Sequence, residues 1–341
     1  MINLDFSKIS TFEALKTLKC NQHFNWVIPF YTFLKEYLDI NDLIVKTSGT
    51  TGTKKSLSVT KTQMQLSAIG TINYFNLKKG SSVLLILSCD FIAGKMMLVR
   101  AIEGKLNLFI AKPVGDPSKY FTHEFDFVPL IPLQVRALIK SRKITNIRKL
   151  LVGGGKADKQ LIEELKPFNI LAFESFAMTE TLTHFALRQI SPLENEWFKT
   201  IGEFKLNVTR NGELIIRENP ISGSEFKTRE LVELKSESEF KWLGRTDNII
   251  NSGGVILIPE EIENKISKLI SIEFVLIGLP DNKFGQKIVL VTQEPFKIEI
   301  EKLNKKLSKF EKIKEFKIID CFPKTESGKI KRKEIINILN A

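Results

Sequence analysis

Cysteine and histidine are scarce in this sequence, which contains three residues of each type among 341. Cys20, Cys89 and Cys321 are odd in number and widely spaced, so they favour reduced thiols over a disulfide framework. With so few histidines and cysteines, the ligand set of a zinc site cannot be assembled from the sequence.

Long apolar runs are also missing. The strongest, Val83 to Leu87, falls far short of the roughly 18 residues that a membrane-spanning helix needs. The start, MINLDFSKIS, lacks the basic and then apolar stretch of a secretory signal. We therefore expect a cytoplasmic protein with no membrane partner. A hydrophobic content of 43% over this length allows a large core and suggests two domains.

Acidic residues are outnumbered by basic ones, which gives a formal net charge of +12. Nucleic-acid binding would explain this charge, but the lysines are dispersed and mostly alternate with glutamates, as in residues 301–317. That alternation is typical of a solvated helical face, so we expect no nucleic-acid partner. A positive surface would also help to attract small anionic ligands.

The segment TSGTTGTKKS at 47–56 is rich in small, flexible and hydroxyl-bearing residues. Gly49 and Gly52 allow backbone N–H groups to turn inward around an anion. Hydroxyl and ammonium groups add donors from Thr47, Ser48, Thr50, Thr51, Thr53, Lys54 and Lys55. The usual nucleotidase loop, G-x-x-x-x-G-K-[ST], is not met, because Lys54 stands where that loop needs its second glycine. The segment therefore predicts a different phosphate-binding loop, with a plain polar turn as the alternative.

Two further segments have distinctive spacing: GRTDNIINSGGVILIPEEIE at 244–263 and PKTESGKIKR at 323–332. Together with the loop at 47–56, they resemble, in the same order, three motifs of the adenylate-forming (acyl-CoA synthetase) superfamily. Lys54 replaces the proline of the family's loop, which should make this loop less stiff. Members of the superfamily join a carboxylic acid to AMP, release pyrophosphate and usually transfer the acyl group to a thiol. The resemblance implies ATP, Mg²⁺ and coenzyme A as the cofactors and co-substrates.

The apolar pattern predicts an α/β fold. From residue 61 onward, helical and strand patterns alternate, as in a parallel α/β sheet. The expected helices are 61–75, 95–103, 133–140 and 159–165, and the expected strands are 82–87, 106–111, 125–131, 149–152 and 170–174. After about residue 184 the pattern changes to shorter strands with turn signals, among them Asn211-Gly212. This part should be β-rich.

The domain organisation is expected to be a large nucleotide- and acid-binding domain over 1–244 and a small, mobile α+β domain over 245–341. The expected elements of the small domain are helices at 259–269 and 300–307 and strands at 273–278, 287–292 and 316–319. The resemblance places the hinge between the two domains at Asp247. A loop residue that absorbs large changes of φ and ψ suits that purpose.

The resemblance also assigns catalytic residues. Lys329, in the last motif, corresponds to the adenylation lysine, whose ammonium bridges the carboxylate and the α-phosphate. FAMTET at 176–181 matches an aromatic–Gly–Met–Thr–Glu motif, with Ala177 in place of the glycine. This match implies that Glu180 holds Mg²⁺, that Thr179 contacts the α-phosphate and that Phe176 stacks on adenine. Charge develops on phosphoryl oxygens in such a reaction, so positioned cations and N–H donors are the main means of catalysis.

The sequence GGGKA at 153–157 follows an expected strand and precedes an expected helix, where backbone can pass close to a ligand. In the family the corresponding loop lines the adenine and acyl pockets, which makes Gly153 and Gly154 candidates for nucleotide binding. A simple tight turn is the alternative. The resemblance implies ribose recognition by Arg245 and Glu230, with Glu230 in place of the family's aspartate.

Weaker features indicate the acid. Segments 92–100, 132–135 and 180–188 resemble 2-succinylbenzoate–CoA ligases of menaquinone biosynthesis, especially short bacterial forms. The chain begins only about 46 residues before the phosphate loop, whereas typical superfamily members have a much longer segment there, which favours a small acid over a lipid chain. The second carboxylate of 2-succinylbenzoate would need a cation or water. The candidate pocket residues are Lys95, Arg100, Thr183 and His184, each of which has an ordinary surface or core role as its alternative.

Other interpretations stay open at this point. Another aryl or short-chain acid–CoA ligase would carry the same motifs, as would a free-standing adenylation enzyme that loads a carrier protein. No appended carrier domain is visible, which favours CoA as the acceptor. A nucleotide-binding protein without catalysis is disfavoured by the presence of Lys329 and Glu180. The oligomeric state is not indicated.

Overall fold

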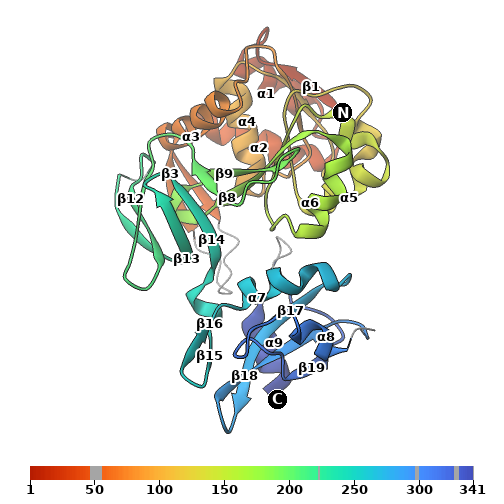
Figure 1. Cartoon of the computed structure of the whole chain (residues 1–341). Helices are drawn as coiled ribbons and strands as arrows, with labels where there is room; N and C mark the ends of the chain where they lie inside the picture. Colours follow the sequence, from red (N-terminus) through yellow and green to blue (C-terminus); the bar gives the residue numbers. More distant parts are fainter. Residues whose placement is uncertain (47–55, 222, 296–298, 326–329, 341) are drawn as a thin grey trace. The chain divides into compact units, whose positions relative to one another are not determined.

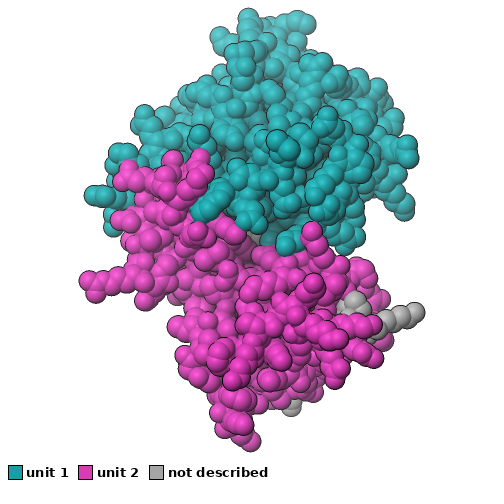
Figure 2. Space-filling model, in the orientation of Figure 1, with its two compact units in different colours: residues 1–205, 217–225 teal, residues 206–216, 226–341 magenta. Residues whose placement is uncertain are grey.

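The structure is a computed structural model, which describes residues 1–46, 56–221, 223–295, 299–325 and 330–340. The chain packs into two compact units (Figure 2), of which unit 1 comprises residues 1–205 and 217–225 and unit 2 comprises residues 206–216 and 226–341. The domain boundary at residues 244 and 245 stays a prediction, because compact packing does not test where the chain bends.

Unit 1 alternates helices and strands, as the sequence predicts (Figure 1). Its helices are α1 (Thr11–Cys20), α2 (Ile28–Asp39), α3 (Lys61–Tyr74), α4 (Ile92–Glu103), α5 (Pro132–Lys140) and α6 (Lys159–Leu165). Its strands are β1 (Ile2–Asp5), β2 (Asp42–Lys46), β3 (Ser56–Thr60), β4 (Ser82–Leu85), β5 (Asn107–Ile110), β6 (Val128–Leu130), β7 (Lys149–Val152), β8 (Leu171–Ala177), β9 (His184–Ser191) and β10 (Phe198–Thr200). The sequence analysis did not predict β1, α1, α2 or the β2–β3 pair.

The strands of unit 1 form the predicted parallel arrangement with antiparallel additions. Strands β4 and β5 are parallel, and so are β6, β7 and β8. Strand β1 joins β5 antiparallel, and β9 joins β8 antiparallel, with β10 next to β9. The change to antiparallel pairing at β9 coincides with the predicted change of pattern near residue 184.

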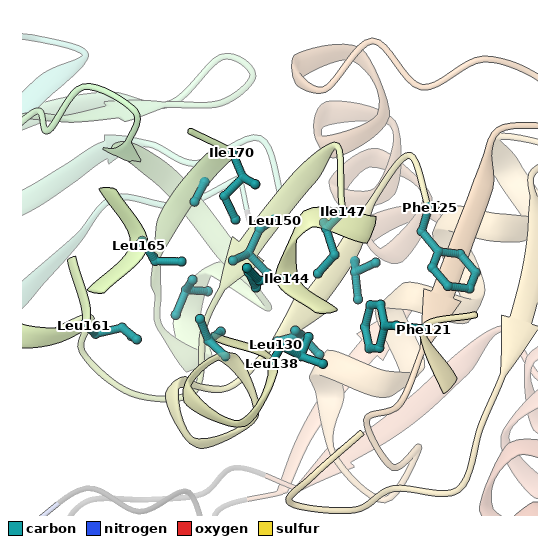
Figure 3. Packing of buried hydrophobic residues seen from close by; sticks show 14 of the residues in the cluster. Phe121, Phe125, Leu130, Leu138, Ile144, Ile147, Leu150, Leu161, Leu165 and Ile170 are labelled. Carbon is teal, nitrogen blue, oxygen red and sulfur yellow. The ribbon is translucent and has the colours of Figure 1, made fainter. Parts of the chain in front are cut away.

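Alternate residues of β8 point to opposite faces of the sheet, and helices pack against both faces of the β6–β8 region. Ala172 belongs to a buried cluster with Leu138 of α5 and Leu161 of α6, part of which is shown in Figure 3. The neighbouring Phe173 instead contacts Tyr74 at the end of α3, with ring centroids 5.6 Å apart. The glycine loop after β7 and the turn after β8 therefore extend from a strand pair that is packed on both sides.

Helix α4 begins three residues earlier than expected, at Ile92. Its third residue, Gly94, packs directly on the backbone of Ser88, where a Cβ atom would overlap the Ser88 carbonyl group. Helix α3 begins at a capping box, in which the Thr60 hydroxyl accepts from the Gln63 N–H while the Gln63 side chain accepts from Thr60. These contacts fix the starts of α3 and α4, and α4 carries two of the four candidate acid-binding residues, Lys95 and Arg100.

Unit 2 is the β-rich and α+β part. Its strands are β11 (Lys205–Val208) and β12 (Glu213–Glu218), which lie mainly in this unit, β13 (Phe226–Ser236), β14 (Glu239–Arg245), β15 (Ile250–Ser252), β16 (Val255–Leu257), β17 (Phe274–Asp281), β18 (Gly285–Thr292) and β19 (Glu315–Ile318). Its helices are α7 (Pro259–Ile266), α8 (Ile300–Asn304) and α9 (Arg332–Asn340). The predicted turn at Asn211-Gly212 is confirmed, with Gly212 at a φ of 80°.

The predicted helix at 300–307 is shorter, because the Asn304 side chain bonds to both the N–H and the carbonyl group of Ile313 and so closes a loop. All three cysteines are free, as predicted. Within the described parts of the chain, no helix combines the length and the apolar character needed to cross a bilayer.

Candidate active site

The predicted FAMTET motif forms the end of β8 and a tight turn that leads into β9. The Thr181 hydroxyl lies 2.7 Å from the Thr183 carbonyl oxygen and 3.1 Å from that of Met178. Leu182 has a left-handed φ of 63°, a conformation that costs a non-glycine residue about 1–3 kcal/mol. Such strain persists only where surrounding contacts enforce it, and it is frequent at functional sites.

Glu180 lies in this turn with its side chain exposed. Its carbonyl oxygen accepts a hydrogen bond from Nδ2 of the buried Asn219 at 3.0 Å, so the backbone is held while the carboxylate faces solvent. Thr179 is in the same short turn, η5 (Thr179–Thr181), but its side chain lies outside the part of the structure that is described. Phe176, at the end of β8, packs edge-on against Phe198, with ring centroids 5.3 Å apart.

The glycine loop at 153–157 follows β7 closely. The Gly153 N–H donates to the Leu130 carbonyl oxygen at 3.0 Å, and a Cβ atom on Gly153 would lie 2.8 Å from Ser175 Oγ. Gly154 has a φ of 75°, and a Cβ atom there would lie 3.0 Å from Ile131 Cγ2. Position 154 therefore favours glycine by its backbone conformation, whereas at Gly153 a Cβ atom would require the Ser175 hydroxyl to rotate away.

We expect Gly154→Ala to lower the free energy of unfolding by about 1–2 kcal/mol, because a left-handed conformation costs any residue with a Cβ atom roughly this much. Urea denaturation measures the change. Gly155→Ala is the matched control, since Gly155 has no left-handed φ and its added Cβ would only touch Pro132 at 3.4 Å. Equal losses of unfolding free energy in the two variants would contradict the explanation by the left-handed conformation of Gly154.

Arg100 is buried in α4 with only 2% of its surface exposed. Its Nε atom has no hydrogen-bond partner among the residues that the structure describes. Burial lowers the pKa of Arg100 to about 9, so the guanidinium remains charged at neutral pH. A buried charge without a counter-ion is costly, and an anionic ligand would offset that cost.

A set of buried polar side chains accompanies Arg100. Ser67 and Thr71, one turn apart on α3, contact the turn after β8: Ser67 Oγ lies 2.7 Å from Thr183 Oγ1, and Thr71 Oγ1 lies 3.1 Å from His184 Nε2. Burial and the positive charge of Arg100 lower the pKa of His184 well below its usual value. The structure thus joins three of the four predicted acid-binding residues to one polar region.

Lys95, the fourth candidate, differs from Arg100. Its side chain is half-buried, and its Nζ lies 5.2 Å from the centre of the Phe33 ring, which is a cation–π contact. Two residues five positions apart on a helix lie on different faces, so Lys95 and Arg100 project in different directions from α4. Arg100 is therefore the better candidate for an internal counter-ion.

The depressed pKa of His184 predicts a loss of stability in acid. The unfolded chain binds a proton at this histidine below pH about 6.5 while the folded protein does not, so the free energy of unfolding should fall by up to about 1.4 kcal/mol per pH unit below that pH. Urea denaturation between pH 7.5 and 5.5 measures the slope. His184→Gln should remove this contribution, and an unchanged slope in the variant would contradict the assignment.

The predicted ribose and hinge residues lie together in unit 2. Glu230 is buried, and its carboxylate accepts from Trp242 Nε1 at 2.8 Å and from Arg245. Asp247 accepts from Arg245 at 3.1 Å and from Arg229 at 2.6 Å. Burial tends to raise the pKa of Asp247, but these two arginines outweigh that effect and lower it.

Some predicted residues cannot be placed. The phosphate loop, including Thr47, Ser48, Gly49, Thr50, Thr51, Gly52 and Lys55, lies outside the described residues, as does Lys329. Conversely, the sequence analysis missed Ser67 and Thr71. Their signal is present, because both fall on the apolar stripe of α3 that includes Met64 and Ala68, where a polar side chain must find a buried partner.

Comparison with known proteins identifies the family of the chain. The chain is 27% identical over 326 residues to 2-succinylbenzoate–CoA ligase of Staphylococcus epidermidis, covering 86% of this chain and 69% of that protein. An acyl-CoA synthetase (AMP-forming)/AMP-acid ligase II-like protein from Dyadobacter fermentans is 30% identical in sequence. Its crystal structure has a TM-score of 0.63, with 92% of this chain and 94% of that chain covered.

The fold is also shared with O-succinylbenzoate coenzyme A synthetase of Bacillus subtilis, a structure in complex with ATP and magnesium ion, at a TM-score of 0.74 and 22% identity. This alignment covers 85% of this chain and 69% of that chain, and it confirms the predicted fold class. A model of the family described as AMP-binding enzyme matches residues 35–211. The chain therefore belongs to the AMP-binding enzyme family.

Proposed function

We propose that this AMP-forming ligase converts 2-succinylbenzoate to 2-succinylbenzoyl-CoA at the expense of ATP. In the first half-reaction, a carboxylate oxygen of the acid attacks the α-phosphorus of ATP, a carboxyl–phosphate bond forms and pyrophosphate leaves. In the second, the thiol sulfur of CoA attacks the acyl carbon, a thioester forms and AMP leaves. The names of relatives over most of the chain support this proposal.

The observation that carries the choice of acid is the burial of Arg100, whose Nε has no hydrogen-bond partner among the described residues. One carboxylate of 2-succinylbenzoate reacts and the other keeps its charge, so the second needs a partner inside the protein. Arg100 supplies it, since a guanidinium forms two parallel hydrogen bonds with a planar carboxylate. Thr183 and His184 contribute hydroxyl and imidazole groups to the same region, and Ser67 and Thr71 hold them in place.

The motifs of the sequence assign the contacts of the nucleotide. In this proposal the phosphate loop surrounds the phosphates, the glycine loop at 153–157 approaches adenine, and Phe176 stacks on it. Glu230 and Arg245 contact the ribose; the carboxylate of Glu230 is already oriented by Trp242, which lies 2.8 Å away. Thr179 and Lys329 contact the α-phosphate, where negative charge increases as the acid attacks.

A magnesium ion fits Glu180. Mg²⁺ usually keeps several waters and binds one or two carboxylates together with nucleotide phosphates, rather than a cage of protein ligands. Glu180 offers one exposed carboxylate on a backbone that Asn219 fixes. When bound, the ion would neutralise charge on the phosphates, while Glu180 itself would orient the nucleotide.

An acid-dependent exchange of radioactive pyrophosphate into ATP tests the first half-reaction. A panel of aryl, dicarboxylic and short-chain acids, assayed with and without Mg²⁺, should show the highest kcat/KM for 2-succinylbenzoate. Thioester formation with CoA then distinguishes a CoA ligase from an enzyme that loads a carrier protein. Preference for an acid with one carboxylate would refute the proposed substrate, and no exchange with any acid would refute the proposed activity.

We further propose that Asp247 is the hinge between the two half-reactions. Asp247→Pro restricts φ to about −65° and should therefore favour one arrangement, so that adenylation and thioester formation differ in the size of their losses. Single-turnover assays measure the two rates separately. Asp247→Ala is the control, because it removes the contacts to Arg229 and Arg245 but leaves the backbone free. Wild-type rates in both half-reactions of the proline variant would place the hinge elsewhere.

A further inference from the structure

Glu174 and Arg188 form a buried ion pair that the proposed reaction does not use. They are direct cross-strand neighbours on β8 and β9, and the guanidinium lies 2.6 Å from Glu174 Oε2. Their side chains are only 7% and 12% exposed. A buried ion pair is weak evidence for stability, because apolar residues of similar volume often stabilise a fold equally well.

The other carboxylate oxygen of Glu174 reaches the glycine loop. Oε1 accepts a hydrogen bond from the Ala157 N–H at 2.8 Å, and Glu174 pairs in register with Val152, the last residue of β7. The glycine loop therefore leaves its strand beside Glu174 and is bonded to the same residue at its far end. Since Arg188 occupies Oε2, the carboxylate can turn only with loss of one of the two contacts.

Arg188 also extends the contacts toward Phe176. Its guanidinium lies 5.3 Å from the centre of the Phe198 ring, a cation–π distance. Phe198 in turn packs on Phe176 with ring centroids 5.3 Å apart. A continuous series of contacts thus runs from Ala157 through the ion pair and Phe198 to Phe176. The glycine loop at one end and Phe176 at the other are the proposed contacts of adenine.

We propose that Glu174 and Arg188 are positioning residues that hold the glycine loop and Phe176 at the spacing that the adenine ring requires. The inference rests on the proposed function and extends it to two residues that touch no substrate. Charge is needed because a carboxylate accepts hydrogen bonds at both oxygens. An amide accepts at one end only, so glutamine at position 174 can satisfy Ala157 or Arg188 but not both.

Titration calorimetry with AMP tests the proposal in the full-length protein, because AMP binding requires neither the acid nor catalysis. We expect Glu174→Gln and Arg188→Met each to raise the Kd for AMP about tenfold, the change that corresponds to loss of one hydrogen bond of about 1.4 kcal/mol. The KM for the acid should stay near its wild-type value. Arg188→Lys should recover only part of the affinity, since an ammonium lacks the planar fork and the stacking surface.

The double variant, Glu174→Gln with Arg188→Met, separates positioning from stability. It leaves no unpaired charge at positions 174 and 188, so its thermal stability should exceed that of Arg188→Met, whereas its affinity for AMP should remain low. Arg148→Met is the control within unit 1, since it breaks an exposed pair with Glu124 and should leave AMP binding unchanged.

Wild-type affinity in the single variants, or affinity that recovers together with stability in the double variant, would overturn the positioning role alone. A wild-type protein that binds neither AMP nor ATP would overturn the proposed function and, with it, this inference.

Discussion

Lys329→Ala is expected to reduce the rate of acyl-adenylate formation by at least about 10²-fold, by analogy with the loss of one preorganised donor to a developing negative charge. The ammonium group is needed where the acid attacks the α-phosphate, so ATP binding should be little changed. The thioester half-reaction, started from preformed acyl-adenylate, should lose much less. Single-turnover measurements of each half-reaction provide the comparison.

Lys333→Ala is the matched control for Lys329, because Lys333 is an exposed lysine of α9 only four residues away. It should retain wild-type rates in both half-reactions. Equal losses of the two half-reactions in Lys329→Ala would show that this residue supports the fold or the nucleotide in general, and would contradict its role in adenylation.

Arg100→Ala should lower kcat/KM for 2-succinylbenzoate by about 10- to 150-fold, which corresponds to the 1.5–3 kcal/mol of a charge-assisted hydrogen bond. The loss should appear in the KM for the acid, since the second carboxylate is chemically unchanged through the reaction, and the KM for ATP should hardly change. Arg100→Met, which fills more of the same volume without charge, should show the same loss.

Stability offers a second measurement on Arg100. Removal of an unpaired buried charge should not destabilise the ligand-free protein, so the Tm of Arg100→Met should equal or exceed that of the wild type. Lys95→Ala is the control for acid binding and should have a small effect. A larger loss in Lys95→Ala would transfer the role to Lys95, and no loss in either variant would remove the main support for the proposed acid.

Much of the fold follows from local patterns. The helices at 61–74, 132–140 and 159–165 and the strand at 149–152 agree with their predictions to within a residue, because the apolar period of each segment matches the face that it buries. The bounds of α4 and α8 depend on contacts with residues outside each helix: Gly94 packs on Ser88, and Asn304 bonds to Ile313. Such contacts produce no periodic pattern of apolar residues in the sequence.

In the candidate site, some residues lie in recognisable motifs of the sequence and others do not. Glu180, Glu230 and Arg245 stay predictions, which rest on motifs with fixed spacing. Ser67, Thr71, Glu174 and Arg188 carry no such motif. The apolar stripe of α3 indicates that Ser67 and Thr71 are buried, but the partners of all four residues become visible only in the fold. The burial of Arg100 is of the same kind: the sequence indicates a cation in α4, whereas the burial of its Nε without a hydrogen-bond partner among the described residues is a property of the packing around it.

The buried charge of Arg100 has one more consequence within the proposed function. An acyl-adenylate is a mixed anhydride that water hydrolyses, and the enzyme must keep it bound until CoA arrives. In that proposal Arg100 would bind the carboxylate that takes no part in either chemical step, so it would bind substrate, adenylate and thioester alike. The guanidinium would thus act as a tether, which prevents the labile intermediate from escaping during the interval between the two reactions.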